Sequence, residues 1–276
     1  MYRNRLLFGL LIALFCVSTF VANADIEKGL HLYLPLNEGT GTPNDLGPNG
    51  FDTELSKKGP SWVDAKNKNA PLQKVLEFNG KSENFVMIDM AGQGKDIDSH
   101  AEKNGGLSIC AWVKVIKTGV DAHGQTRQPI VMKGAGGAWE FSLYVYDNLA
   151  PGMSVWNCDG SGVSEPSGGN LGNDWHYQCG TFDAKKGVMV YLDAEKNPVS
   201  QAGVNANIPC DGNRPVFIAH REDGQWLNAV IAEVRMWDRV IEVDEMKEAM
   251  ETVGGLAVRP ADKLPATWGK IKDRRF

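Results

Sequence analysis

The sequence predicts an all-β protein, an antiparallel two-sheet sandwich with one short C-terminal helix. Short runs of β-branched and aromatic residues recur along the chain, and Gly, Asn and Asp turn signals separate them. No long helical pattern precedes residue 240, whereas parallel sheets need a helix between successive strands. Together these observations favour a sandwich of about a dozen short strands.

Two segments show the alternation of a half-buried strand most clearly. From Leu30 to Leu36 every second residue is leucine, so these leucines are expected on one face, with Pro35 at an edge or a bulge. In the segment 139–146 the expected core face consists of alternate residues, Trp139, Phe141, Leu143 and Val145. Further strands are expected at 75–80, 85–90, 107–115, 129–133, 153–156, 175–181, 188–192, 216–219 and 229–237.

The remaining segments are two long loops, a helix and a tail. Residues 38–72 and 157–174 are rich in turn-forming residues, and loops of this length are often functional. Residues 241–252 form the one expected helix, with Ile241, Met246 and Met250 toward the sandwich. Length favours one domain over residues 25–253, followed by a C-terminal tail over 254–276.

The chain opens with the pattern of a secretory signal. Arg3 and Arg5 precede an apolar run over residues 6–21, and Ala-Asn-Ala at 22–24 is a small-x-small cleavage site. The run is short for a spanning helix, and no basic stop-transfer cluster follows it. Residues 1–24 are therefore expected to be a cleaved signal peptide, and the protein to be secreted, either extracellular or in the periplasm or cell envelope.

Charge narrows the classes of partner. Removal of Arg3 and Arg5 lowers the Lys and Arg count from 29 to 27 against 34 Asp and Glu, so the mature net charge is −7. An acidic chain without a basic stripe argues against nucleic acid and anionic lipid as partners. No second apolar segment approaches spanning length, so no membrane insertion of the mature chain is expected.

Four cysteines remain in the mature chain, Cys110, Cys158, Cys179 and Cys210. Four cysteines allow three pairings, and their spacing does not choose among them. An even count in an exported chain favours disulfides over free thiols. The absence of a close Cys-x-x-Cys pair argues against zinc.

Several motifs follow one another in a recognisable order. They are Leu34-Pro-Leu-Asn-Glu-Gly-Thr-Gly41 with Asp45-Leu-Gly-Pro-Asn-Gly50, Leu76-Glu-Phe-Asn-Gly80 with Phe85-Val-Met-Ile88, Trp175-His176 through Asp183, Val190-Tyr-Leu-Asp193, and Ile231-Ala-Glu-Val-Arg-Met-Trp237. Their order resembles the laminin-G-like domain of the concanavalin A-like lectin and glucanase superfamily, from about residue 30 to 252. The resemblance implies a jelly roll, a fold that hosts many functions.

The resemblance also implies bonds and ligands. The cysteine placement is similar to the pentraxin branch, which implies a Cys110–Cys179 bond inside the sandwich and leaves Cys158 with Cys210. Many relatives hold structural calcium, and the matching positions here are Asp45, Asn79, Gly80 and Glu233. Relatives often carry Asp before the Glu of the closing strand, but this chain has Ala232, and Glu233 could pair with Arg235 instead.

Catalytic residues are not assigned. Retaining glucanases of this fold place two Glu residues on one strand, whereas the carboxylates of Glu242-Val-Asp-Glu-Met-Lys-Glu248 have a different spacing and lie in the expected helix. The five histidines are scattered without ligand spacing.

Three aromatic residues are candidates for ligand contact. Tyr144 and Trp156 fall on strand positions opposite the expected core face, and Trp226 lies in a polar loop, so all three could stack on a sugar ring. The favoured function is a secreted, non-catalytic module that binds a glycan or an extracellular protein. The alternatives are a glycoside hydrolase or lyase on the same fold and a purely structural envelope or matrix protein.

Overall fold

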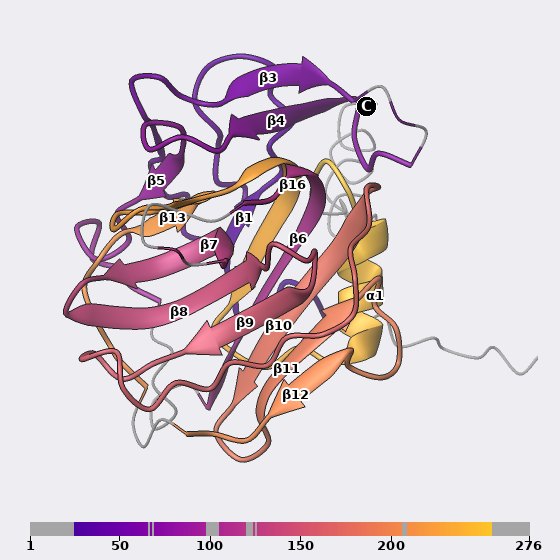
Figure 1. Cartoon of the computed structure of the whole chain (residues 1–276). Helices are drawn as coiled ribbons and strands as arrows, with labels where there is room; N and C mark the ends of the chain where they lie inside the picture. Colours follow the sequence, from indigo (N-terminus) through magenta and orange to yellow (C-terminus); the bar gives the residue numbers. More distant parts are fainter. Residues whose placement is uncertain are drawn as a thin grey trace, which may run out of the picture.

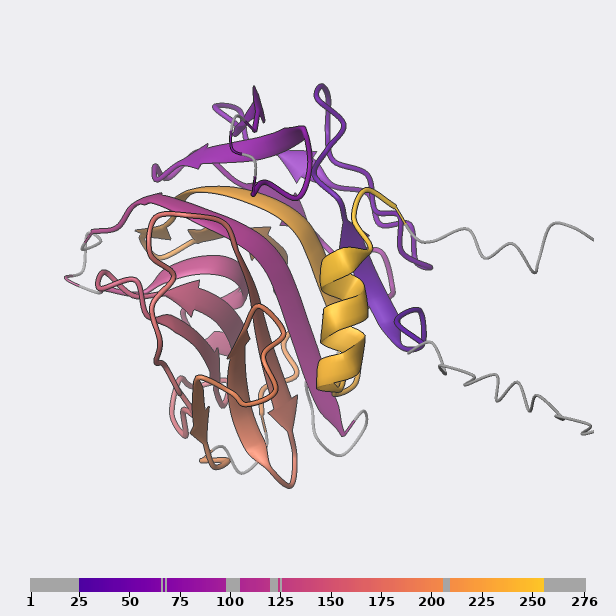
Figure 2. The same cartoon turned by 90° about the vertical axis from the view of Figure 1, so that its right-hand side faces the viewer.

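Two antiparallel sheets stacked face to face make up the fold, and one helix packs on the outside of the larger sheet (Figure 1, Figure 2). The computed structural model describes residues 25–255 except 66, 68, 98–104, 120–123, 125 and 206–208. The predicted all-β sandwich is confirmed. The expected signal peptide and the tail from residue 256 lie outside the described residues.

The larger sheet has eight strands. Seven follow the order β12-β11-β10-β6-β16-β4-β3, and β1 also pairs with β16. Their bounds are β1 Leu30–Leu34, β3 Ser61–Asp64, β4 Lys74–Asn79, β6 Gly106–Lys117, β10 His176–Asp183, β11 Gly187–Leu192, β12 Ser200–Ala202 and β16 Asn228–Trp237.

The smaller sheet has six strands in the order β2-β5-β13-β7-β8-β9, and β14 and β15 form a separate hairpin. Their bounds are β2 Glu54–Leu55, β5 Val86–Ile88, β7 Gln128–Ala135, β8 Ala138–Val145, β9 Pro151–Val155, β13 Val216–Ile218, β14 His220–Arg221 and β15 Gln225–Trp226.

Strand alternation builds the core between the sheets. Phe141, Leu143 and Val145 of β8 face it as predicted. Trp139 does not, because the β7–β8 pairing shifts register after Lys133, and its half-buried ring stacks on the Arg221 guanidinium at 3.6 Å. A register irregularity after Leu30 likewise separates that residue from the core leucines of β1.

Helix α1 (Val243–Glu251) confirms the predicted helix. It begins with a capping box in which the Glu245 carboxylate accepts the Glu242 N–H at 2.8 Å. Ile241 and Met246 are buried as predicted, and Met250 is half-buried. These residues cover one half of the outer face of the larger sheet, where they pack with Tyr177 and Tyr191.

Both expected disulfides are present, Cys110–Cys179 and Cys158–Cys210. The first joins residues directly opposite each other on β6 and β10. Its expected position inside the sandwich was wrong, because Ile109 and Ala111 occupy the core-facing positions of β6. The bond lies instead on the outer face of the sheet, in the apolar cluster that includes Met246 of α1.

A fully buried arginine, Arg235 of β16, ties the helix to the sheet. Its guanidinium donates to the carbonyls of Ala249 and Thr252, which α1 leaves unpaired at its C-terminus, and to the Glu233 carboxylate at 2.8 Å. The Tyr33 ring lies 4.2 Å from the guanidinium, and its hydroxyl donates to Glu233 at 2.9 Å. Burial raises the pKa of Glu233, and Arg235 opposes this shift.

Glu233 itself is held in an unusual backbone conformation. Its φ of 56° lies in the left-handed region, where a bulge interrupts the β6–β16 pairing between Ala232 and Arg235. The Glu233 N–H is donated to the Pro35 carbonyl at 3.0 Å, so Pro35 follows β1 beside a bulge, as predicted. The bulge thus shifts the alternation of β16 by one residue, so that Ile231 and Val234 both face the core while Arg235 faces the helix.

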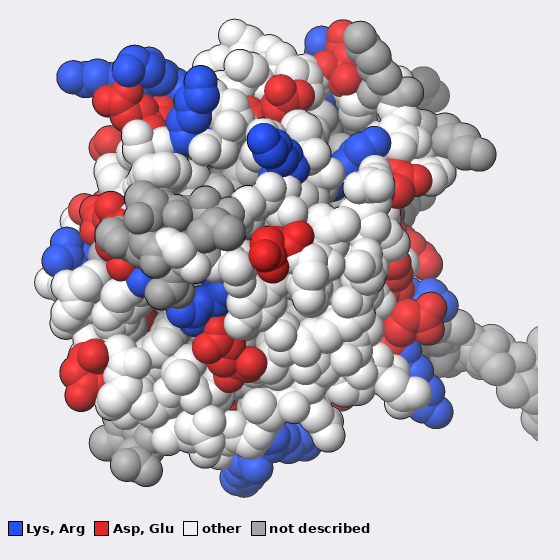
Figure 3. Space-filling view, in the orientation of Figure 1, with Lys and Arg blue, Asp and Glu red and all other residues white. Residues whose placement is uncertain are grey.

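Charge is distributed without a continuous patch on the face drawn in Figure 3. Small groups of basic and acidic side chains alternate over that surface. A long-range field of one sign therefore does not mark a binding area on this side of the described molecule.

We expect Arg235→Met to lower the free energy of unfolding by about 3–5 kcal/mol, because Glu233 would remain buried without its cation. The double variant Glu233→Gln/Arg235→Met should recover part of that loss. Urea unfolding measures both. Arg214→Met is the matched control, because Arg214 forms an exposed pair with Glu222 at 3.6 Å. A single variant as stable as this control would contradict the role given to Arg235.

Candidate ligand-binding groove

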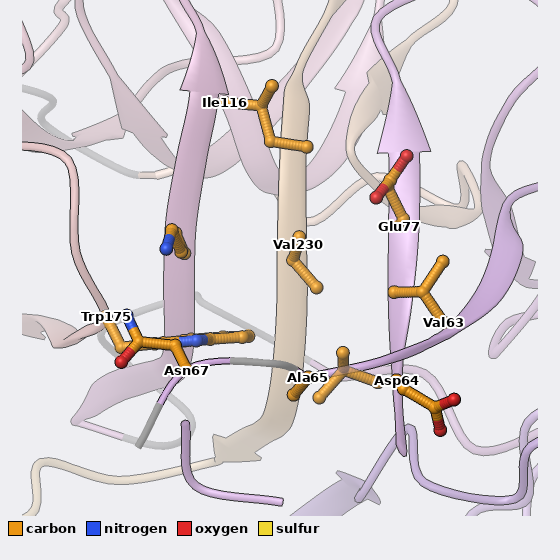
Figure 4. A pocket seen from close by; sticks show the side chains of 10 residues that line it. Val63, Asp64, Ala65, Asn67, Glu77, Ile116, Trp175 and Val230 are labelled. Carbon is orange, nitrogen blue, oxygen red and sulfur yellow. The ribbon is translucent and has the colours of Figure 1, made fainter. Parts of the chain in front are cut away.

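The half of the larger sheet that α1 does not cover carries a groove of about 970 Å³ on its outer face (Figure 4). Strands β3, β4, β16 and β6 form its floor, and the segment before β10 closes one end with Trp175. Figure 4 shows Trp175, Asn67 and Ala65 at that end and Ile116 at the other.

Strand alternation gives the groove an apolar floor. In β4, Leu76 and Phe78 face the core, so Val75 and Glu77 face outward. Val75 packs with Val230 of β16, and both are buried, whereas Ile116 is 51% exposed. Val75, Val230 and Ile116 together give the concave surface an apolar lining, which is typical of small-molecule binding sites.

Polar side chains stand around this floor. Glu77 rises from β4, and Asp64 of β3 pairs with Lys74 at 2.5 Å. Lys114 of β6 lines the opposite wall. The groove therefore presents carboxylate acceptors on one side and an ammonium donor on the other.

The closed end is fixed by hydrogen bonds to one aspartate. Asn67 and Asn69 donate their amide N–H groups to the Asp174 carboxylate at 2.5 and 2.6 Å, and the Trp175 backbone N–H donates to it at 2.8 Å. The Trp175 N–H, the Asn69 amide and the Lys114 charge lower the pKa of Asp174. The loop that follows β3 is thus joined to the segment before β10.

Asp64 and Glu77 do not stand opposite each other in the groove, as the two carboxylates of a retaining glycosidase do. Glu77 pairs with Ser61 in the β3–β4 register, and Asp64 lies three residues further along β3. That offset is about 10 Å of strand, against about 5–5.5 Å between the carboxyl groups of retaining enzymes. Figure 4 shows the two side chains pointing away from each other.

A family model described as the concanavalin A-like lectin/glucanases superfamily matches residues 89–247. The chain belongs to this superfamily. The resemblance drawn from the strand motifs is thereby confirmed. A comparison with curated proteins finds no match.

Solved structures with the same concanavalin A-like fold include bacterial toxin binding domains. The binding domain of Paraclostridial mosquitocidal protein 1 has a TM-score of 0.61 at 14% identity, over 82% of this chain and 52% of that one. The botulinum neurotoxin serotype D ligand-binding domain in complex with N-acetylneuraminic acid has a TM-score of 0.59 at 8% identity, over 82% and 51%. This concanavalin A-like chain spans about half the length of those domains.

Sequence reasoning did not identify the groove. Trp175 is buried, and its ring closes the end of the groove. Alternation does predict which residues of β4 face outward, since Leu76 and Phe78 face the core. Strand β4 pairs with β16, which lies far away in the sequence, and the alternation of residues does not predict which strands are neighbours.

Two of the three predicted ligand-binding aromatics are buried, so the expectation that they are exposed was wrong. Tyr144 is 1% exposed, because its ring packs over Gly152, where a side chain would collide with it, and beneath Glu165 of the following loop. Trp156 is 6% exposed and lies 5.9 Å from the Trp139 ring. Trp226, in the β14–β15 hairpin, is half-buried.

The residues predicted to hold calcium do not meet as one ligand set. Asp45 accepts the backbone N–H groups of Tyr33, Gly47 and Phe51, and Glu233 is bound by Arg235. Asn79, followed by Gly80, pairs with Asn228, five residues before Glu233 and thus about 16 Å away along β16. The described residues hold no cluster of three or more His, Cys, Asp or Glu side chains suited to a metal. Calcium binding therefore stays a prediction, and Asp45, Asn79, Gly80 and Glu233 do not form a single site for the ion.

We expect Tyr144→Ala and Trp156→Ala each to destabilise the fold by about 3–5 kcal/mol, because each removes a buried ring. Urea unfolding measures the change. Ile116→Ala, at an exposed position, should stay within about 0.5 kcal/mol of the parent. An unchanged free energy of unfolding in the Tyr144 variant would contradict burial of its ring and indicate that the side chain is exposed.

Calcium should leave the melting temperature unchanged relative to chelator, because the Asp45 and Glu233 carboxylates already have protein partners. If a site existed, calcium at a concentration of about 100 times its dissociation constant would stabilise the fold by roughly 2.7 kcal/mol. A calcium-dependent rise that disappears in Asp45→Asn would show that the site exists and that the residue set was misjudged.

Proposed function

We propose that the protein is a secreted, non-catalytic binding module that holds a glycan in the groove on the larger sheet. The observation that carries this proposal is the groove itself, in which an apolar floor and polar walls stand on neighbouring strands of one sheet. Sites built on strands hold their side chains in fixed positions, which lowers the entropy lost on binding.

The chemistry of the walls suits a sugar. A pyranose ring offers C–H groups on its faces and hydroxyl groups around its edge, so it needs apolar contact and hydrogen-bond partners together. Val230 and Ile116 supply the first, and the Glu77 carboxylate and the Lys114 ammonium supply acceptors and donors. The Asp64 and Glu77 carboxylates are balanced by the Lys74 and Lys114 ammonium groups, so a neutral glycan fits the groove better than a charged one.

The comparisons support a binding module. The fold is shared with toxin binding domains, and one of them was solved in complex with N-acetylneuraminic acid. The shared part is about half of that domain, so the likeness supports the class of function and not the sugar.

The cysteines and the N-terminal sequence support secretion. Two disulfides are typical of proteins that fold in an oxidising environment. Residues 1–24 carry the pattern of a secretory signal. Among the described residues no helix is long and apolar enough to cross a membrane.

We expect the parent protein to bind at least one neutral glycan on an array and the groove variants to bind it less well. Glu77→Gln and Ile116→Ser should each weaken binding by about 1 kcal/mol, or roughly fivefold, through loss of an acceptor and of apolar contact. Glu54→Gln, on exposed β2, is the matched control and should bind as the parent does.

Two results would count against the proposal. Equal affinity in the parent and both groove variants would place the ligand elsewhere on the molecule. Release of reducing ends from a polysaccharide by the purified protein would favour the glycoside hydrolase alternative instead.

A further inference from the structure

Three chemically active side chains meet at one end of the smaller sheet, away from the groove. Lys133 of β7 and Glu140 of β8 are fully buried, and Asp96 reaches them from the segment after β5. The Lys133 Nζ lies 2.7 and 3.0 Å from the two Glu140 oxygens and 3.1 Å from Asp96 Oδ2. It also donates to the Gly212 carbonyl.

We propose that Lys133 and Asp96 condense to an intramolecular amide, with Glu140 as the proton carrier. The arrangement holds an amine nucleophile, a carboxyl electrophile and a second carboxylate within hydrogen-bond distance of one nitrogen. Holding the reacting groups in place lowers the barrier by removing the entropy of their encounter. A lysine amine becomes a nucleophile when a neighbouring base removes its proton.

The geometry distinguishes the two carboxyl groups. Both Glu140 oxygens lie within 3.0 Å of Nζ, which is the bidentate contact of an ion pair and suits proton exchange. Glu140 is further fixed by the Gly212 N–H at 2.9 Å. Asp96 meets Nζ through a single oxygen, and its Oδ1 is buried without a hydrogen-bond partner. Its carboxyl group is therefore the one left open to attack on carbon.

The surroundings favour exchange of a proton between the partners. Lys133 and Glu140 are fully buried, so water does not solvate their charges. Burial raises the pKa of Glu140 to about 8, although Lys133 opposes the shift, and burial also raises the pKa of Asp96. A carboxyl group with such a pKa can accept and return a proton near neutral pH.

The reaction balances without another reagent. The Lys133 ammonium gives one proton to Glu140, and the freed electron pair on Nζ forms the C–N bond to Asp96 Cγ. Glu140 passes that proton and a second one from the nitrogen to one Asp96 oxygen, whose C–O bond breaks as water leaves. Lys133 and Asp96 each lose a charge, and Glu140 ends as a carboxylate.

Burial supplies the driving force. A charge removed from water bears a desolvation penalty, and the amide removes the charge of fully buried Lys133 together with that of half-buried Asp96. The bond would close a loop of 37 residues between the end of β5 and β7, in addition to the two disulfides. It lies on the other sheet from the groove, so the proposal is independent of the proposed function.

Peptide mapping of the purified, reduced and denatured protein tests the bond directly. Trypsin should fail to cleave after Lys133, and the peptide that begins at Asp96 should be joined to the peptide that begins at Gln128. The mass of the joined peptide should be lower than the sum of the two separate peptide masses by the mass of one water molecule. Recovery of the two peptides separately, with cleavage after Lys133, would overturn the proposal.

Variants test the roles of the three residues. Asp96→Ala should abolish the joined peptide, and Glu140→Gln should abolish it while Lys133 and Asp96 are still present. Glu165→Gln, which changes a carboxylate that pairs with Arg127 near the same sheet, is the matched control and should keep the bond. A bond that persists in Glu140→Gln overturns the role of Glu140. A peptide joined through Glu140 overturns the choice of Asp96. If Glu140→Gln does not fold, the map of the parent still decides whether the bond exists.

Discussion

The buried guanidinium of Arg235 is the interaction on which the layout of the larger sheet depends. It reaches Glu233 and Tyr33 within the sheet and the last carbonyls of α1 outside it, so one side chain joins β16, β1 and the helix. The helix C-terminus has no basic residue of its own in the last turn, so this contact supplies the missing donors. Further bonds add to it, since Gly254 donates its N–H to Glu233 at 2.7 Å. Because α1 is fixed over the half that contains the Cys110–Cys179 bond, it leaves open the part of β3, β4, β16 and β6 that carries the groove.

Two cations among the described residues are fully buried, and they differ in what they can do. Arg235 and Lys133 are both fully buried, and each pairs with a buried glutamate. A guanidinium keeps its proton at any physiological pH and is planar, so Arg235 serves as a permanent multi-point donor. An ammonium is a compact donor that becomes a nucleophilic amine once it loses a proton. The same environment thus stabilises structure at Arg235 and allows covalent chemistry at Lys133, where Asp96 adds a carboxyl group with one open side.

The sequence predicts the elements better than it predicts the surfaces. Alternation of leucines and aromatics identifies β1 and β8, and the spacing of Ile241, Met246 and Met250 identifies the helix, because periodicity reports which face of an element is apolar. Periodicity does not report what covers the other face. Tyr144 stands opposite the core as predicted, but Glu165 from the loop after β9 and the neighbouring Gly152 leave it no contact with solvent. The disulfide partners came from the family resemblance, since spacing alone allowed three pairings.

The loops and the helix that pack on the outer faces of the two sheets decide where a ligand can bind. The loop after β9 pairs with the edge of the smaller sheet through Ser164 and Ser167, and its Glu165 accepts from Tyr146 at 3.0 Å and from Arg127 at 2.5 Å. Around Tyr144 the outer face of that sheet is therefore closed by the protein's own side chains. In the part of the chain that the structure describes, β4 and β16 line the open groove, and α1 packs over the other half of the larger sheet. A ligand that needs a wide surface with both apolar and polar contacts finds it on the larger sheet, although sequence alone favoured the smaller one.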